Sequence, residues 1–341
     1  MSKKLDQITA YQPDTDEYKI RADANESFIG LPLQIKENIA DAIMQMDLNR
    51  YPDPYAAELC NAAADYYGTN PQNIAPGNGS DELIGIIINS FLQKNSRLCV
   101  CAPDFSMYNF YAHIAEVEVV GAIKSNLKID KAELISKAKN ADMLIFSNPC
   151  NPTGRALAAK DVIEIASALE CIVVVDEAYM EFYGQSVIPY IGEHKNLIVL
   201  RTCSKALGLA AARVGFAISN PKNTQDILKA KSPYNLSSPN QAIAKVLLLE
   251  REYIDDCMKN ILSAKKQLYT LIFELGYDII DTDTNFVLLK DNDAEHIREY
   301  LAQNGVAVRQ IMGDYLRITA ASPQDNLYIV QLLKQFKNGG K

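Results

Sequence analysis

From residue 83 onward, short apolar runs alternate with longer helix-like stretches, and this alternation limits the fold more than any other feature. Strands that alternate with helices predict an α/β fold built on a doubly wound, mixed but mostly parallel sheet. A continuous β-branched run such as 172–175 predicts a strand that is buried on both faces. The predicted strands are 98–101, 117–120, 143–146, 172–175 and 197–200.

The pattern changes after about residue 221, where long helical stretches begin. One of them runs from roughly 240 to 275, and Gly276 is placed to end it. Further strands are predicted at 286–289, 306–309 and 315–318, with a closing helix after Ser322-Pro323. Because 341 residues exceed the size at which one core stops growing, we expect a smaller carboxyl-terminal α/β domain.

Charge and composition exclude several classes of partner. The net charge is −8 and no strong basic run occurs, which argues against nucleic-acid binding. No apolar stretch is long enough to span a membrane, and the amino terminus lacks a secretory signal, so a soluble cytoplasmic protein is expected. Seven cysteines without a CxxC pair favour reduced thiols, and the three widely spaced histidines argue against a metal site.

Polar residues stand directly after three of the predicted strands. They are Asn148, Asp176 and Thr202. Doubly wound sheets bind ligands at the carboxyl ends of their strands. We therefore expect a small-molecule site at this edge of the sheet.

The segment 77–82, Gly-Asn-Gly-Ser-Asp-Glu, precedes an apolar helix. Free N–H groups at a helix start suit a phosphate, although an ordinary helix cap is the better interpretation of this motif by itself. It is neither a Walker A loop nor a dinucleotide-binding glycine fingerprint.

Two further segments suit an aromatic ring that carries a nitrogen. The loop 148–154 contains two prolines and a glycine, so the Asn151 amide has a fixed position from which to donate to a phenolate oxygen; a plain turn is the alternative. Asp176 ends an apolar strand, and a buried carboxylate needs a cationic partner such as a protonated ring nitrogen.

Ser204-Lys205 and Arg213 form the last cluster. A surface position is the usual one for a lysine, but small and apolar residues flank Lys205, which favours a lysine that forms an imine and then acts as a base. Ser204 and Arg213 would complete a phosphate site with Ser80 and Asp81. Together the clusters predict a site for a phosphorylated aldehyde cofactor.

These segments, in this order, resemble the fold-type I pyridoxal-phosphate-dependent aminotransferases, specifically the histidinol-phosphate aminotransferase family. The resemblance covers nearly the whole chain, from Tyr11-Gln12-Pro13 to 316–319. It implies an amino-terminal arm (1–30) that joins the small domain, a large cofactor-binding domain (31–240) and a small domain (241–341).

By this resemblance, Lys205 holds pyridoxal 5′-phosphate as a Schiff base and carries the proton in catalysis, and Asp176 pairs with the ring nitrogen. Asn151 and Tyr179 contact the phenolic oxygen, and Phe105 stacks on the ring. The residues expected around the phosphate are Ser80, Asp81, Thr202, Ser204 and Arg213.

The resemblance also implies an obligate homodimer, because Tyr51 would reach the phosphate in the partner's site. Arg317 would bind the substrate α-carboxylate. The other implied substrate contacts are Arg309, Asn25, Tyr11 and Tyr234. The implied reaction uses glutamate as amino donor and imidazole acetol phosphate as acceptor.

The sequence departs from the family pattern at 27–30 and in the spacing of Arg309 and Arg317. A related amino-acid aminotransferase and a threonine-phosphate decarboxylase therefore stay open as alternatives. A non-catalytic binding protein of the same fold is the alternative from a different class.

Overall fold

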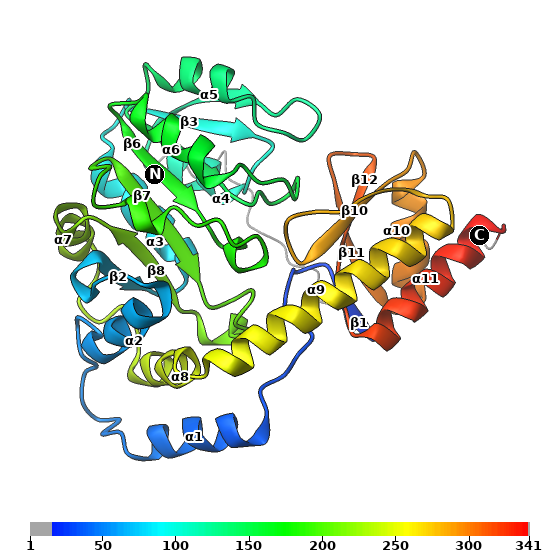
Figure 1. The fold of residues 1–341 in the computed structure, drawn as a ribbon, viewed down its shortest axis with the longest axis horizontal. Helices are drawn as coiled ribbons and strands as arrows, with labels where there is room; N and C mark the ends of the chain where they lie inside the picture. The colour runs from blue at the N-terminus through cyan, green and yellow to red at the C-terminus, as the bar shows by residue number, and fades with distance from the viewer. Residues whose placement is uncertain (1–15, 340–341) are drawn as a thin grey trace, which may run out of the picture.

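The computed structural model describes residues 16–339, which form two α/β units connected by one long helix, α9 (Figure 1). The sheet of the larger unit has the strand order β2-β8-β7-β6-β5-β3-β4. Its strands are β2 (Ile74–Gly77), β3 (Arg97–Ala102), β4 (Glu118–Ile123), β5 (Met143–Ser147), β6 (Ile172–Asp176), β7 (Leu197–Thr202) and β8 (Gly215–Ser219).

Strands β4, β3, β5, β6 and β7 are mutually parallel, whereas β8 is antiparallel to both of its neighbours. The mixed, mostly parallel sheet is thus confirmed, with all five predicted strands in it. Strands β2 and β8 were not predicted. The first has only four residues and ends in Pro76-Gly77, and the second begins at Gly215, so neither shows a clear apolar run.

Both faces of this sheet are buried, as the β-branched runs predict. Along β5, Leu144 and Phe146 face one apolar cluster while Met143 and Ile145 face the other, since successive strand side chains point to opposite faces. Residues of α3, α4 and α7 contribute to one cluster and residues of α2, α5, α6 and α8 to the other. The helices are α1 (Leu33–Met44), α2 (Ala57–Tyr67), α3 (Ser80–Phe91), α4 (Met107–Ile114), α5 (Lys131–Ala138), α6 (Ala159–Ser167), α7 (Pro221–Ala230) and α8 (Ser238–Leu248).

The smaller unit has a five-stranded sheet in the order β1-β11-β12-β10-β9. Its edge strand β1 comes from the amino-terminal segment and runs parallel to β11; the other pairs are antiparallel. The three predicted strands and the closing helix are confirmed. The elements are β1 (Ile20–Ala22), β9 (Asp278–Ile280), β10 (Phe286–Lys290), β11 (Val306–Ile311), β12 (Tyr315–Thr319), α10 (Ala294–Gln303) and α11 (Pro323–Lys337).

The helical stretch predicted from 240 to 275 is two helices, α8 and α9 (Arg251–Glu274), so the prediction of one helix is wrong. Glu250, with φ −93° and ψ 59°, interrupts the helical backbone between them. Gly276 follows the end of α9 with φ +75°, as expected for a residue that ends a helix.

Helix α9 contributes residues to the apolar cores of both units. Ile254 and Ile261 belong to an apolar cluster of the larger unit, whereas Leu268 and Ile272 belong to that of the smaller one. Since α8 packs against α1 and α2, we propose a domain boundary inside α9 rather than at residue 240.

Short 3-10 turns at 71–73, 180–182, 188–190 and 210–212 complete the elements. All seven cysteines are free thiols, and Cys99 and Cys101 share one packed layer. No helix in the described part of the chain has the length and apolar character needed to cross a membrane. Within residues 16–339, no three acidic, cysteine or histidine side chains are grouped to bind a metal ion.

Candidate functional site

A cavity of about 170 Å³ lies at the carboxyl ends of β5, β6 and β7. Every predicted cofactor contact except Tyr51 lines it, although these residues come from segments far apart in the chain. Ser147 and Ala178 line it too. The full lining is Ser80, Asp81, Phe105, Ser147, Asn151, Asp176, Ala178, Tyr179, Thr202, Ser204, Lys205 and Arg213.

One end of the cavity is suited to an anion. Helix α3 begins at Ser80 with Gly79 (φ +86°) as its N-cap and without a capping side chain, so the ordinary cap considered above is absent. Arg213 lies directly against this helix start, because a Cβ on Gly79 would stand 2.6 Å from its Nη2. Two positive groups side by side, the helix dipole and a guanidinium, favour a bound phosphate.

Two hydroxyls beside Arg213 complete this end. Arg213 Nη1 donates to Ser204 Oγ at 3.3 Å, and Thr202 Oγ1 donates to Ser204 Oγ at 3.0 Å. Strand β8 packs directly against the start of α3. A Cβ on Gly215 would lie only 2.3 Å from Ser80 N. Glycine at that position lets strand and helix start pack closely enough to keep the Ser80 N–H beside Arg213.

Asp81 was expected beside the phosphate, but its side chain is hydrogen-bonded to a tyrosine. Its Oδ2 accepts from Tyr111 OH at 3.0 Å, so the carboxylate is tied to α4, and only its backbone N–H is suited to an anion. Tyr111 carries no sequence signal for this role, since it occupies an apolar face of α4 like any core aromatic.

The carboxylate of Asp176 lies on the floor of the cavity and is buried. Its Oδ2 accepts from Tyr108 OH at 2.9 Å and its Oδ1 from Ala178 N at 3.1 Å. Burial raises the pKa of Asp176 from 3.8 to about 6, and the Tyr108 hydrogen bond opposes that rise. A bound cation would favour the ionised form, which suits a protonated ring nitrogen.

Lys205 stands between the two units. Its Nζ donates to Ala24 O at 2.9 Å and lies 5.9 Å from the centre of the Tyr179 ring. Asn25, at φ +55°, donates from Nδ2 to Tyr179 OH at 2.8 Å. Thr319 of β12 bonds to Asn25 in turn, so the smaller unit fixes the segment that contacts the lysine.

A second cavity, of about 470 Å³, adjoins the first and shares Phe105, Asn151, Tyr179 and Lys205 with it. Three arginines on one face of the smaller sheet line this second cavity. They are Arg21, Arg309 and Arg317.

Arg309 and Arg317 stand directly opposite each other on β11 and β12. Like charges at directly opposite positions repel each other. An anionic ligand between or above the two guanidinium groups would relieve this repulsion. Arg317 Nη1 donates to Asn151 Oδ1 at 2.6 Å, which links the substrate side to the cofactor side. Arg21 is ion-paired with Asp23 at 2.8 Å.

Two of the predicted residues that the structure describes are not brought to these cavities. Tyr51 and Tyr234 stack on each other, with ring centres 4.5 Å apart, and line neither cavity. Their exposed fractions are 81% and 46%. Tyr11 lies outside the described residues.

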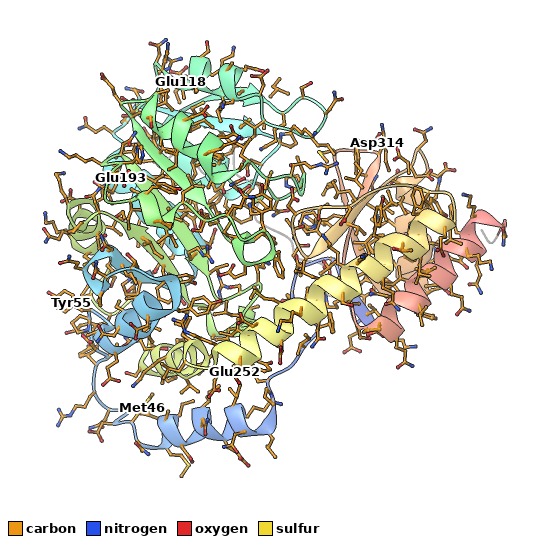
Figure 2. The ribbon with its side chains drawn as sticks, in the orientation of Figure 1. Met46, Tyr55, Glu118, Glu193, Glu252 and Asp314 are labelled. Atoms are coloured by element: carbon orange, nitrogen blue, oxygen red, sulfur yellow. The ribbon has the colours of Figure 1, made fainter. Side chains whose placement is uncertain are left out.

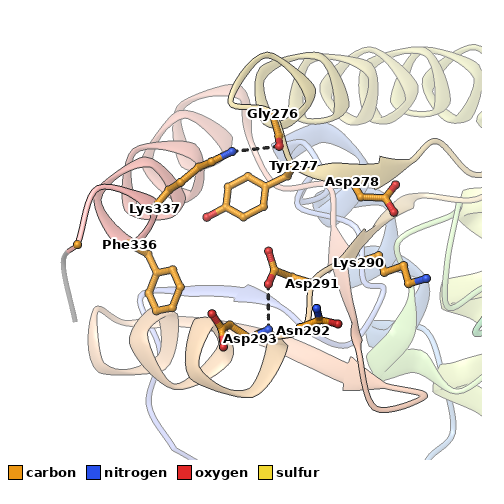
Figure 3. Close-up of a pocket in the computed structure, with 10 residues that line it drawn as sticks. Gly276, Tyr277, Asp278, Lys290, Asp291, Asn292, Asp293, Phe336 and Lys337 are labelled. Atoms are coloured by element: carbon orange, nitrogen blue, oxygen red, sulfur yellow. Dashed lines mark hydrogen bonds between the residues drawn. The ribbon is translucent and has the colours of Figure 1, made fainter.

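A larger cavity, of about 680 Å³, lies in the smaller unit and contains none of the predicted residues (Figure 3). Two of its polar groups have local partners: Lys337 Nζ donates to Gly276 O, and Asp293 N donates to Asp291 Oδ1. The candidate site consists of the two smaller cavities around Lys205.

The comparisons with known proteins agree with this geometry. Residues 19–333 match the family model "Aminotransferase class I and II". The chain is 39% identical to histidinol-phosphate aminotransferase of Clostridium novyi, over 97% of this chain and 96% of that protein. For the same enzyme of Clostridium kluyveri the identity is 39%, over 98% and 97%. The crystal structure of histidinol-phosphate aminotransferase from Sinorhizobium meliloti in complex with pyridoxal-5′-phosphate superposes with a TM-score of 0.88 at 26% identity, covering 94% of this chain and 91% of that one.

The raised pKa of Asp176 predicts a specific pH dependence of stability in the ligand-free protein. The folded carboxyl binds its proton at about pH 6 and the unfolded one near 3.8. The folded state is therefore favoured by protonation at low pH and loses that contribution as the pH rises toward and through 6. Between pH 5 and 7 the loss should be about 1 kcal/mol.

Urea unfolding of the wild type and of Asp176→Asn, each at pH 5 and pH 7, measures this loss in the free energy of unfolding. The variant keeps an acceptor for Tyr108 but cannot ionise, so the difference between the two proteins isolates this carboxyl. Equal pH dependence in both proteins would show that Asp176 is not the group responsible.

Proposed function

Because this chain belongs to the class I and II aminotransferases, we propose that it binds pyridoxal 5′-phosphate at the cavity around Lys205 and interconverts histidinol phosphate and 2-oxoglutarate with imidazole acetol phosphate and glutamate. The observation that carries the proposal is the convergence of an anion site, a buried carboxylate and a lysine in one cavity. The names and the full-length similarity of the relatives support the choice of substrate.

The lining fits this cofactor at each of its polar groups. The start of α3 with Arg213 would bind the phosphate, Asp176 would pair with the ring nitrogen, and Asn151 would contact the ring oxygen. Phe105 offers an aromatic face to the ring. When bound, pyridoxal phosphate supplies an aldehyde that condenses with amines and a ring that accepts electrons.

The chain's own residues divide the remaining tasks. Lys205 Nζ would move a proton to and from the substrate α-carbon, acting as base and then as acid. The guanidinium of Arg317 would bind the α-carboxylate of glutamate by two parallel hydrogen bonds. That contact would orient the α-carbon toward Lys205, which lines the same cavity. Arg309, opposite Arg317, would bind the γ-carboxylate of glutamate or the phosphate of histidinol phosphate.

We further propose that two copies of the chain share their sites. Tyr51 is too exposed for a residue that serves its own cavity, and further exposed apolar residues lie on α1 and the segment that follows. Leu33, Met44, Leu48 and Tyr55 are all largely exposed, and Figure 2 shows Tyr55 at the outer edge of the larger unit. An exposed apolar surface of this kind favours association.

Sedimentation of the purified protein tests the association. We expect the mass of two chains at micromolar concentration, and Tyr51→Ala is expected to weaken cofactor binding while leaving the mass unchanged. Leu327→Ala, at an exposed apolar residue of α11, is the control. A stable single chain with full cofactor affinity would contradict the proposal.

The cofactor assignment predicts a visible absorption band in the wild-type protein that borohydride removes. Lys205→Ala should lack the band, because no other lysine among residues 16–339 lines the cavity. Lys222→Ala, at an exposed lysine of α7, should keep it. The three proteins are incubated with pyridoxal phosphate, freed of unbound cofactor, reduced with borohydride and denatured; a ring that stays attached to Lys205→Ala would disprove the role of this lysine.

The substrate assignment predicts that histidinol phosphate is preferred over histidinol by about 10- to 100-fold in kcat/KM, since the phosphate adds charge-assisted hydrogen bonds with the Arg309 guanidinium. Coupled assay of glutamate formation from 2-oxoglutarate measures the ratio. Arg309→Met should reduce it, whereas Arg298→Met on α10 should not. Release of carbon dioxide from threonine phosphate without an oxo acid would favour the decarboxylase alternative instead.

A further inference from the structure

A fully buried ion pair lies beside the candidate site. Lys124 Nζ and Asp104 Oδ2 are 2.9 Å apart, and each side chain is only 1% exposed. Asp104 follows β3 and Lys124 follows β4. The lysine also donates to the carbonyl oxygens of Pro103, at 2.8 Å, and Cys101. The pair thus ties together the ends of two neighbouring strands.

The carboxylate of Asp104 accepts hydrogen bonds on both oxygens. Oδ1 accepts from Phe105 N at 2.8 Å and from Ser147 Oγ. Oδ2 accepts from Lys124 Nζ and from Ser147 N at 3.3 Å. Ser147 Oγ in turn accepts from Asn151 N at 3.3 Å. The network therefore reaches the backbone of Phe105 and Asn151, two residues that line both cavities.

Stability alone does not account for such a pair. The free energy needed to remove two charges from water is about as large as the free energy gained from their attraction. Well-packed apolar residues in their place often give a protein that is equally stable. What a buried carboxylate offers instead is four directed acceptor positions, and here they fix one arrangement of two loops. The Asn151 side chain also accepts from Arg317 at 2.6 Å, so the arrangement extends to the proposed substrate arginine.

We propose that Lys124 and Asp104 are positioning residues that fix Phe105 and Asn151 for the cofactor ring. The inference rests on the proposed function for its consequence in catalysis. Small displacements of contacting groups cost up to about 100-fold in rate, so the network is expected to act on kcat more than on KM.

The decisive variant is the double substitution Lys124→Met with Asp104→Asn. It leaves no unpaired buried charge, so it should fold better than Lys124→Met alone, which leaves Asp104 without its cation. Asparagine has one acceptor oxygen where aspartate has two. At least one of the N–H groups of Phe105 and Ser147 therefore loses its acceptor.

Hydrogen exchange of the protein without added cofactor measures this loss directly. In the double variant, peptides covering 103–107 and 147–152 should exchange at least about tenfold faster than in the wild type, as expected for the loss of a charge-assisted hydrogen bond. Leu134→Ala is the control: Leu134 is fully buried in α5 and lines neither cavity, so its loss lowers stability without touching the network.

Circular dichroism in the visible band of the bound cofactor is the second readout, because it reports a fixed orientation of the ring. The double variant should lose most of this signal and about 10- to 100-fold in kcat, with KM for glutamate little changed. Wild-type exchange rates in both peptides, or an unchanged dichroic signal, would overturn the proposal. If the wild type binds no pyridoxal phosphate, the proposed function fails, and the exchange data still decide whether the network fixes the two loops.

Discussion

The carboxylate of Asp176 lies at the end of the central strand β6, where water cannot solvate its charge. Among residues 16–339, the donors to this carboxylate are the Tyr108 hydroxyl and the Ala178 backbone N–H. Two donors without a cation leave its pKa raised. The rest of the site is arranged around this carboxylate, with an anion-binding helix start at one side and Lys205 in the bend that follows the neighbouring strand β7.

The two units meet at Lys205, and neither unit holds a complete site. The larger one supplies the lysine, the carboxylate and the phosphate end. The smaller one supplies the arginines, and the segment before α1 carries Asn25 to the Tyr179 hydroxyl. Because Thr319 fixes Asn25, any shift of the smaller unit would reach the hydrogen bonds that surround Lys205. Such coupling is what a site needs if it must close around one substrate and release another.

Much of the site was predictable because its residues stand at strand ends. Apolar runs place Asp176 and Thr202 at the same edge of a parallel sheet, and Lys205 follows immediately. The prolines of 148–154 fix Asn151 close by. Residues without such a position were missed. Tyr108 and Tyr111 look like core aromatics of α4 in the sequence, and only their hydroxyl partners, Asp176 and Asp81, distinguish them from core residues.

Local periodicity and residue type were enough to predict the longer strands, the two α/β units and the motifs of an aminotransferase, but not the short strands β2 and β8 or the break between α8 and α9. Tertiary structure decided which distant groups meet. The meeting of the two units places Arg317 against Asn151, and the packing of β3, β4 and β5 buries Lys124 against Asp104. Neither contact has a local signal, because each is formed by segments that come together only when the sheets assemble.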